Sequence, residues 1–430
     1  MATASADIAR ARSPGGYSVK PMVALVIVVY FTGGIATVLV DTLVPKLKGL
    51  FALTYTEAML TQFCFFLAYF LVSIPGGMLV ARIGYIRSIV VGLLLVASGC
   101  LLFAPAAAAG LYPGFLLALF VMAGGITTFQ IAANPFIASL GSPQGSHSRL
   151  TLALGFNSLG YTIGPLIGAA FILSGNAIAP RNPQTAAPAM LDHYRRAEAH
   201  VVQGPFLVIA AVLLVVAAVF WTLRRRDLRP TSTDPNSFKG LSLLRRPRFV
   251  MGVVTMFAYV GAEVSVGSIL TNYLMLDKTL HVDAPTAGRL AALFWGGAMV
   301  GRFIGSLLLT RVRPGVMLCM CALAASLLAV TSVATFGVFA GVAIIGIGLF
   351  NSIMFPTIFT LAIEELGEQT AKGSGLICMA VVGGAVVPLA TGAVADGWGL
   401  SFAPLVPALC YSLIAAYGFL VSRGGDSTRV

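Results

Sequence analysis

A short apolar stretch, FQIAANPFIASLG (residues 129–141), carries side chains able to bind a ligand rich in hydroxyl groups. Gln130 and Asn134 stand four residues apart, so their amides share one face of a helix. An amide in an apolar environment costs free energy unless hydrogen bonds satisfy it. Pro135 follows, and proline removes a backbone donor and crowds the preceding helical turn. We therefore expect Pro135 to break this helix, so that backbone and amide groups face a cavity lined by protein or water.

Other apolar stretches carry polar pairs at the same spacing. Asn157 and Tyr161 share one helix face, and a second pair, Tyr259 and Glu263, shares another. Gln62 and Tyr69 line up on a third helix, and Asn272 and Asn351 are further inward-facing candidates. A site that binds hydroxyl groups selects strongly, because its own polar groups stay unpaired with any other ligand. The alternative is that these amides only bond between neighbouring helices, as happens often in membranes.

Three ionisable residues lie within apolar stretches: Asp41, Glu263 and Arg302. Such residues are costly in a membrane and mark ion or substrate pathways. Desolvation disfavours the ionised carboxylate, so a buried acid can carry a proton near neutral pH, and its ionised form can bind sodium. A plainer interpretation stays open for each acid. Asp41 can be a carboxylate at the outer end of its helix, near Lys46. Glu263 can be a static partner of Arg302, since buried charges are usually paired.

The elements that position these residues follow from composition. Hydrophobic residues make up 58% of the 430 residues and charged residues only 10%, and the mean hydropathy is +0.93. A soluble domain carries about 25% charged residues, so this chain needs a lipid bilayer as its partner. A spanning helix takes about 20 apolar residues, which predicts an all-α membrane protein with twelve transmembrane helices. They lie near residues 22–45, 57–80, 88–107, 114–140, 151–174, 201–223, 249–275, 289–309, 316–335, 338–363, 373–395 and 403–422.

Basic residues predict the orientation of these helices. With the N-terminus inside, nineteen Lys and Arg residues fall on the inner side and seven on the outer side, Arg302 aside. This asymmetry places both termini in the cytoplasm. The basic stretch RRRDLRPTSTDPNSFKGLSLLRRPR reads as a linker between two halves. The predicted parts are a tail (1–21), a six-helix bundle (22–223), the linker (224–248), a second six-helix bundle (249–422) and a tail (423–430).

Segments of the two halves are similar in sequence, which predicts two pseudo-symmetric six-helix bundles. GMLVARIGYIRSIVVG (77–92) resembles GSLLLTRVRPGVMLCM (305–320), and NPFIASLG (134–141) resembles part of FPTIFTLAIEELG (355–367). Internal repeats of this kind are typical of transporters whose binding site lies between the halves.

Several classes of protein are disfavoured by the sequence. The six cysteines lie in apolar stretches without a CxxC pair or a neighbouring histidine, so we expect no metal site and no disulfide framework. HExxH, GxSxG and Walker sequences are absent, so we expect no enzyme, no catalytic residues and no bound cofactor. The net charge of +12 is spread over short loops, which argues against nucleic acid as a partner.

GGMLVARIGYIR (76–87) is similar to the signature of the major facilitator superfamily, which lies between helices two and three. Gly77, Arg82, Gly84 and Arg87 match that signature, whereas Ala81 stands where an acid is usual. Within the superfamily the chain most resembles the fucose permease and glucose/galactose transporter family. The strings that carry this resemblance are VLVDTLVPKLK, MLTQFCFFLAYFLVSIPGG, FQIAANPF, SRLTLALGFNSLG, YVGAEVSVGSILTNYL and FPTIFTLAIEELG.

The resemblance implies a monomeric transporter of the bacterial inner membrane that imports a hexose together with H⁺ or Na⁺. It implies a cation-coupling role for Asp41 and sugar-facing positions for Asn134 and Asn157. Gln130 stands where the fucose–proton branch has a functional glutamate, and GAEVSVGS with Glu263 looks like the glucose/galactose branch. One string points elsewhere: GYTIGPLIGA (160–169) is similar to a motif of proton-coupled drug exporters. The exporter alternative and the choice between H⁺ and Na⁺ stay open.

Overall fold

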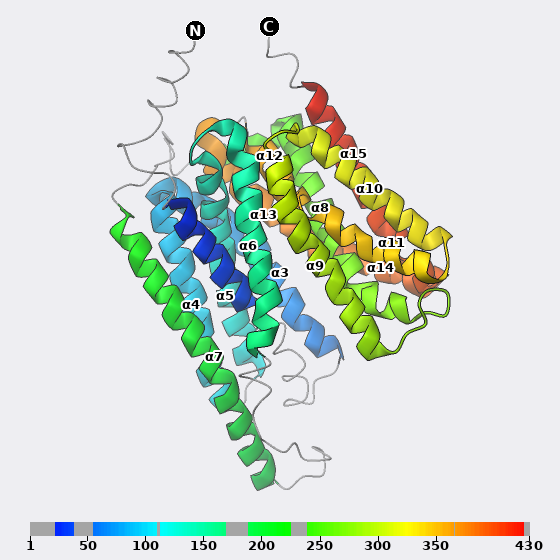
Figure 1. Cartoon of the computed structure of the whole chain (residues 1–430). Coiled ribbons are helices and arrows are strands. Elements are labelled where there is room, and N and C mark those ends of the chain that lie inside the picture. The colour runs from blue at the N-terminus through cyan, green and yellow to red at the C-terminus, as the bar shows by residue number, and fades with distance from the viewer. Residues whose placement is uncertain are drawn as a thin grey trace, which may run out of the picture.

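The computed structural model describes residues 22–37, 55–109, 112–168, 188–224, 239–364 and 366–424. This part of the chain is helical and holds no strand (Figure 1). Nine of the described helical segments are long and apolar enough to cross a membrane. Large apolar side chains between 65% and 79% exposed cover their outer faces, a surface suited to lipid; examples are Val215, Leu307, Leu327, Phe339 and Leu389. The expected all-α membrane architecture is confirmed.

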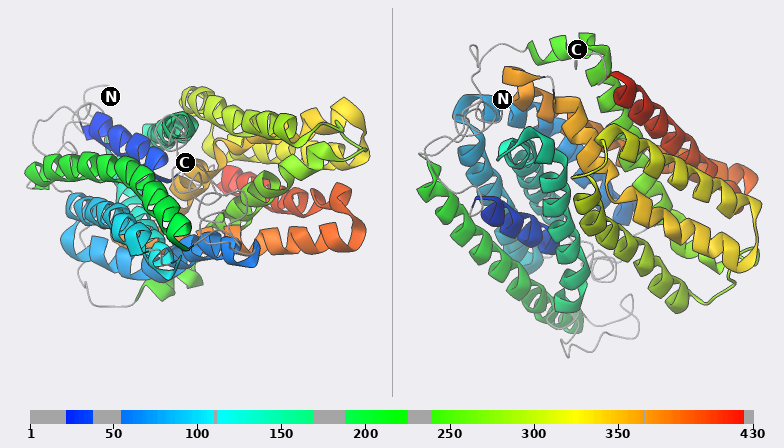
Figure 2. Two further views of the ribbon diagram at one scale, coloured as in Figure 1. Left: turned by 90° about the horizontal axis from the view of Figure 1, so that it is seen from below. Right: turned by 45° about the horizontal axis from the view of Figure 1, so that its top comes forward.

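The helices form two groups that lie side by side (Figures 1 and 2). The first half contains Met22–Thr37, α3 (Tyr55–Ile83), α4 (Tyr85–Ala109), α5 (Tyr112–Ser139), α6 (Ser146–Gly168) and α7 (Pro188–Thr222). The second half contains α8 (Pro247–Met275), α9 (Ala284–Leu308), α10 (Pro314–Ala334), α11 (Gly337–Asn351), α12 (Met354–Ile363), α13 (Thr370–Met379), α14 (Gly383–Trp398) and α15 (Leu405–Gly424). Within the halves, α4 packs against α5 and α7, and α10 packs against α11 and α15.

The two halves touch mainly along two seams, α3 with α13 and α6 with α9, and further contacts join α5 to α13 and α6 to α12. At the first seam, a Cβ on Gly375 would lie 2.6 Å from the Ser73 carbonyl oxygen, and a Cβ on Gly77 would lie 3.1 Å from the Ala371 carbonyl oxygen. Glycine at both positions lets the two backbones meet, as is common between helices in lipid. At the second seam, the rings of Phe156 and Phe303 meet edge to face with centroids 5.6 Å apart.

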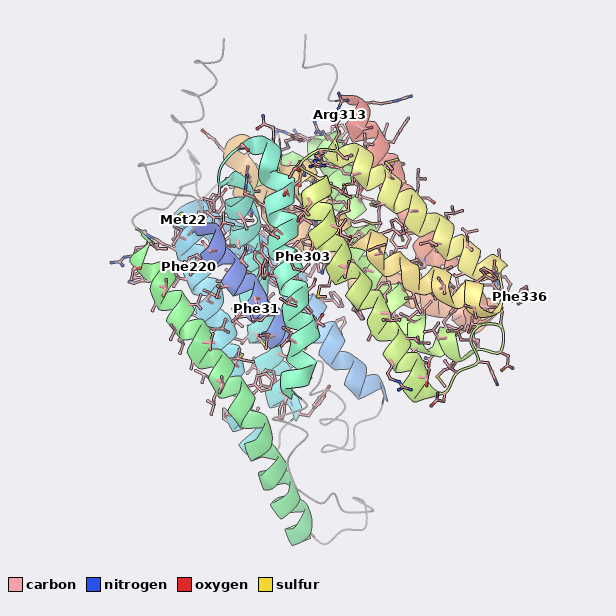
Figure 3. The ribbon with its side chains drawn as sticks, in the orientation of Figure 1. Met22, Phe31, Phe220, Phe303, Arg313 and Phe336 are labelled. Carbon is pink, nitrogen blue, oxygen red and sulfur yellow. The ribbon has the colours of Figure 1, made fainter. Side chains whose placement is uncertain are left out.

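Side-chain positions distinguish the two ends of the molecule (Figure 3). Met22 and Arg313 lie toward one end, which we call the Met22 end, and Phe336 lies at the far end of the second half. The turn between α3 and α4 contains Gly84, whose φ of 88° is unfavourable for other residues. Beside this turn, Arg82 is exposed and Arg87 is half-buried.

Helix breaks occur where the sequence did not predict them. The expectation that Pro135 breaks its helix is wrong, because α5 continues from Tyr112 through Pro135 to Ser139. Pro135 removes a single N–H donor, the one that would bond the Ile131 carbonyl, and the helix tolerates this loss. The predicted segment 338–363 instead breaks between Asn351 and Met354, and segment 373–395 breaks at Ala380–Val382. The helix predicted over 201–223 begins earlier, at Pro188.

Candidate functional site

A pocket lies in the first half, enclosed by the helix Met22–Thr37 and helices α3, α4, α5, α6 and α7. Its polar and aromatic lining residues are Tyr30, Thr37, Phe65, Tyr69, Phe129, Gln130, Asn157 and Tyr161. Four residues selected from the sequence therefore meet here: Tyr69, Gln130, Asn157 and Tyr161. The last three come from α5 and α6, which are adjacent in sequence and share a short connection through Pro143–Gly145.

A chain of hydrogen bonds holds one wall of this pocket. The Asn157 amide nitrogen donates to the Tyr30 carbonyl oxygen at 2.8 Å. The Tyr30 hydroxyl donates to the Asn134 side-chain oxygen. Asn134 is fully buried, and its Nδ2 atom has no hydrogen-bond partner. Asn134 therefore supports Tyr30 from behind and is not itself among the residues that line the pocket.

Aromatic and aliphatic side chains supply the other walls. The rings of Tyr30 and Phe129 meet edge to face with centroids 5.1 Å apart, and the ring centroids of Phe65 and Tyr69 lie 5.3 Å apart. Gln130 is half-buried, and its amide lies near the Tyr69 hydroxyl. Amides beside ring faces suit a cyclic ligand that has hydroxyl groups at its edge and C–H groups on its faces.

The sequence analysis did not select Tyr30, Thr37, Phe65 or Phe129 for this pocket. A usable signal existed for two of them. Tyr30 and Thr37 are seven residues apart, which is close to two helical turns, so both face the same direction from one helix.

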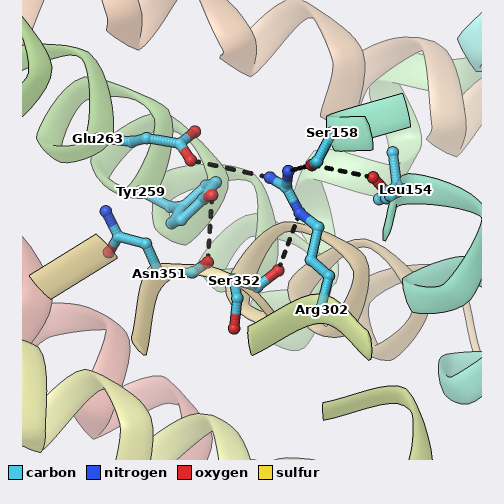
Figure 4. A network of polar contacts seen from close by, with 7 residues as sticks. All are labelled: Leu154, Ser158, Tyr259, Glu263, Arg302, Asn351 and Ser352. Carbon is cyan, nitrogen blue, oxygen red and sulfur yellow. Dashed lines mark hydrogen bonds and ion pairs between the residues drawn. The ribbon is translucent and has the colours of Figure 1, made fainter. Parts of the chain in front are cut away.

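A charged network lies in the second half and reaches the first (Figure 4). Arg302 on α9 donates from Nε to the Ser352 carbonyl oxygen at 3.2 Å. Its Nη1 atom donates to the Ser158 hydroxyl on α6, across the seam. Its Nη2 atom lies 3.8 Å from Oε1 of Glu263 on α8. The side chains of Arg302 and Glu263 are each 15% exposed, so two of the expected intramembrane charges do meet.

The break between α11 and α12 supplies the backbone carbonyl acceptors of this network. A helix that ends leaves backbone carbonyl groups without intrahelical partners. The Asn351 carbonyl accepts from the Tyr259 hydroxyl at 3.3 Å, and the Ser352 carbonyl accepts from Arg302. The Asn351 amide is fully buried, and neither its oxygen nor its nitrogen has a hydrogen-bond partner. Tyr411 on α15 lies beside it.

Other residues selected from the sequence do not join these clusters or lie outside what the structure describes. Asn272 is exposed and lies nine residues beyond Glu263 on α8. Gln62 belongs to α3, but its side chain is outside the described part of the chain. Asp41 is likewise outside the described residues. Its coupling role stays a prediction.

Three comparisons with known proteins agree. The model of the Major Facilitator Superfamily matches residues 26–388. A glucose/galactose transporter of Brucella abortus is 46% identical over 394 residues, 92% of both chains. An L-fucose-proton symporter of Escherichia coli is 36% identical over 405 residues, 91% of both chains. The solved structure of FucP in the outward conformation superimposes with a TM-score of 0.86 at 32% identity, covering 94% of this chain and 99% of FucP. The chain belongs to the Major Facilitator Superfamily.

Proposed function

We propose that this protein is a secondary transporter that imports a hexose such as glucose or galactose together with a coupling cation. The observation that carries the proposal is the pocket of amides and aromatic rings, which is joined through Asn157 and Ser158 to the buried charge pair of Arg302 and Glu263. The relatives named glucose/galactose transporters support the choice of sugar.

In the proposed sugar site each lining group has a distinct task. The Gln130 and Asn157 amides offer both donors and acceptors to vicinal hydroxyl groups. The rings of Tyr30, Phe65 and Tyr161 cover the C–H faces of the sugar. Asn134 holds the Tyr30 hydroxyl and so fixes the orientation of that ring.

The coupling cation is a proton or Na⁺, with Asp41 and Glu263 as the proposed carboxylate sites. No other cofactor is required. A cation drives sugar accumulation only if its binding changes the affinity for sugar or the equilibrium between the two orientations of the carrier. The named E. coli relative is a proton symporter, which favours H⁺.

The proposed cycle alternates access by moving one half relative to the other. The halves contact each other through α3–α13 and α6–α9, and the likeness to FucP in the outward conformation supports a state closed toward the cytoplasm. In this proposal the Met22 end faces the cytoplasm of a bacterial inner membrane, both termini are cytoplasmic, and a monomer surrounded by lipid is the working unit.

An exporter of drugs or metabolites is not favoured. The relatives that align with most of the chain are named as transporters or symporters of sugars. The pocket has six amide or hydroxyl side chains, from Tyr30, Thr37, Tyr69, Gln130, Asn157 and Tyr161. This set of donors and acceptors suits a ligand with several hydroxyl groups better than a hydrophobic drug.

Uptake by purified protein in liposomes tests the proposal. Radiolabelled D-glucose, D-galactose and L-fucose are offered separately under an inward proton gradient, under an inward sodium gradient, and with sodium replaced by choline. We expect accumulation of glucose or galactose above the external concentration under one gradient and equilibration only without it. The proposal fails if none of the three sugars enters faster than into empty liposomes, or if gradients drive export of a hydrophobic dye instead.

A further inference from the structure

Arg302 is shared between the two halves of the molecule. Arg302 belongs to α9 in the second half, but its Nη1 atom donates to the Ser158 hydroxyl on α6 in the first half. Its Nε atom stays within the second half, on the Ser352 carbonyl oxygen. All three guanidinium nitrogens therefore face a partner, and one of those partners belongs to the opposite half (Figure 4).

The contact between Arg302 and Glu263 is electrostatic and loose. The 3.8 Å between Nη2 and Oε1 is longer than a hydrogen bond, and Oε1 has no hydrogen-bond partner. Besides Arg302, the titratable side chains that face this carboxylate are Tyr259 from its own helix and Tyr411 from α15. Among these described groups, Arg302 supplies the positive charge that balances Glu263.

The Ser158 contact leads directly to the proposed sugar site. Ser158 is 5% exposed and follows Asn157, which lines the pocket and donates to Tyr30. The Ser158 hydroxyl also donates to the Leu154 carbonyl oxygen one turn earlier, at 3.1 Å, so its orientation is fixed by α6. One peptide unit of α6 thus separates the charge pair from the pocket.

We propose that Arg302 is a positioning residue that transmits the charge on Glu263 to the α6–α9 seam and, through Asn157, to the sugar pocket. This inference rests on the proposed symport and names how its cation and sugar are coupled. When a proton or Na⁺ neutralises Glu263, Arg302 loses the one carboxylate that it faces among the described residues, and a buried cation without a counter-charge is strongly unfavourable. The arrangement that encloses Arg302 between α6 and α9 then loses stability relative to one that admits water. Cation binding thereby favours reorientation of the halves.

The competing interpretation is a static ion pair that only stabilises the second half. It predicts that breaking the pair lowers thermal stability without changing which orientation is populated. The two interpretations differ in one observable, the distance between the halves, and that observable does not require transport.

The test uses nitroxide labels on Ser139→Cys in the first half and Glu368→Cys in the second, in full-length protein whose native cysteines are replaced. Both positions are exposed, beside the ends of α5 and α12. Pulsed electron spin resonance in nanodiscs gives the distance distribution. We expect Glu263→Gln and Ser158→Ala each to raise the ratio of long to short distances by about tenfold, within the usual range of coupling between sites.

Matched variants control for general damage. Ser326→Ala also removes a buried serine hydroxyl that bonds between helices, but within the second half, to Ala408 and Ser412, and it should keep the parent distribution. The double variant Glu263→Gln with Arg302→Gln leaves no uncompensated charge but also lacks the contact with Ser158, so its distribution should match that of Ser158→Ala. If Arg302→Gln does not fold, Arg302→Lys is used in its place, because lysine keeps the positive charge and lacks the planar guanidinium group.

The proposal is overturned if folded Glu263→Gln and Ser158→Ala variants show the distribution of the Ser326→Ala control. Sugar exchange by the parent protein is measured in parallel. Absent exchange refutes the symport function, whereas intact exchange with unshifted distances refutes the role of Arg302 alone.

Discussion

His147, at the start of α6, and Thr360, near the end of α12, are hydrogen bonded to each other across the boundary between the two halves. Both side chains are buried. The Thr360 hydroxyl also lies 2.6 Å from the Pro356 carbonyl oxygen, so the imidazole meets a hydroxyl that is already held in place. His147 precedes the apolar part of its helix, and this contact therefore belongs to the closed Met22 end, apart from the pocket.

The His147 contact predicts a pH dependence. Burial, with a smaller effect of the nearby Arg149 charge, lowers the pKa of His147 to about 4 from an ordinary value of 6.5. The closed arrangement thus favours the neutral imidazole, and its advantage is full above pH 6.5 and declines as the pH falls toward 4. As the pH falls from 6.5 to 4, we expect the Ser139–Glu368 label pair to show a growing share of long distances. His147→Gln should weaken this pH dependence. An unchanged pH dependence in that variant would show that His147 does not contribute to closure.

Gln130→Ala should weaken sugar binding. The substitution removes a half-buried amide from the pocket, and a lost hydrogen bond to a desolvated ligand costs about 1–3 kcal/mol. Equilibrium binding of the transported hexose, measured by calorimetry, checks the loss. Asn272→Ala serves as the matched control, because that amide is exposed and away from the pocket. Wild-type affinity in Gln130→Ala would place this glutamine among purely structural residues.

Tyr30→Phe should lower both stability and sugar affinity. Without the Tyr30 hydroxyl, the buried Asn134 amide loses its one observed partner, at a cost of about 1–3 kcal/mol. Thermal unfolding in detergent and hexose binding are measured together. Tyr273→Phe also removes a buried hydroxyl, one that donates to the Ser332 carbonyl oxygen, so it should lower stability with sugar affinity intact. Equal effects of the two variants on affinity would contradict a pocket role for Tyr30.

Asp41→Asn should abolish accumulation driven by the gradient while leaving counterflow exchange partly intact. An amide cannot take up and release the coupling cation as a carboxylate does, whereas exchange needs only sugar binding and reorientation. Radiolabelled hexose uptake in liposomes, with and without a gradient, separates the two activities. Accumulation at the parent level would show that Asp41 is not required for coupling.

Gly375→Val should prevent closure of the α3–α13 seam. Even the first carbon of the new side chain would lie 2.6 Å from the Ser73 carbonyl oxygen, a backbone atom that cannot move aside alone. The label pair should then show mainly long distances at neutral pH. Gly392→Val is a suitable control because a Cβ at Gly392 meets no atom within 4 Å. A closed distribution in Gly375→Val would mean that the seam adjusts in another way.

The sequence predicted the helices and the meeting of Gln130 with Asn157 and Tyr161, because apolar runs and four-residue spacing report directly on helix faces. It did not reveal which neighbour covers each face. Asn134 shares a face with Gln130 yet lies behind Tyr30. Asn272 could have been excluded, since nine residues from Glu263 correspond to half a turn around α8.

The sequence analysis did not predict the break after Asn351. A local signal exists in Pro356, which has no backbone N–H to bond the Ser352 carbonyl four residues earlier, but α5 carries Pro135 without ending there, so proline alone does not decide where a helix breaks. The partners that satisfy the freed carbonyl groups, Tyr259 and Arg302, come from helices far away in the chain. Proline thus frees the Ser352 carbonyl locally, while the tertiary contacts that satisfy it cannot be predicted from the local sequence.

The break between α11 and α12 also affects how this protein tolerates mutation. The oxygens that Tyr259 and Arg302 bond there belong to the main chain of Asn351 and Ser352. No substitution at Ser352 can delete its carbonyl, so the guanidinium keeps its anchor with any side chain that fits the buried space beside Gly301. Substitution of Arg302, by contrast, removes the donor itself.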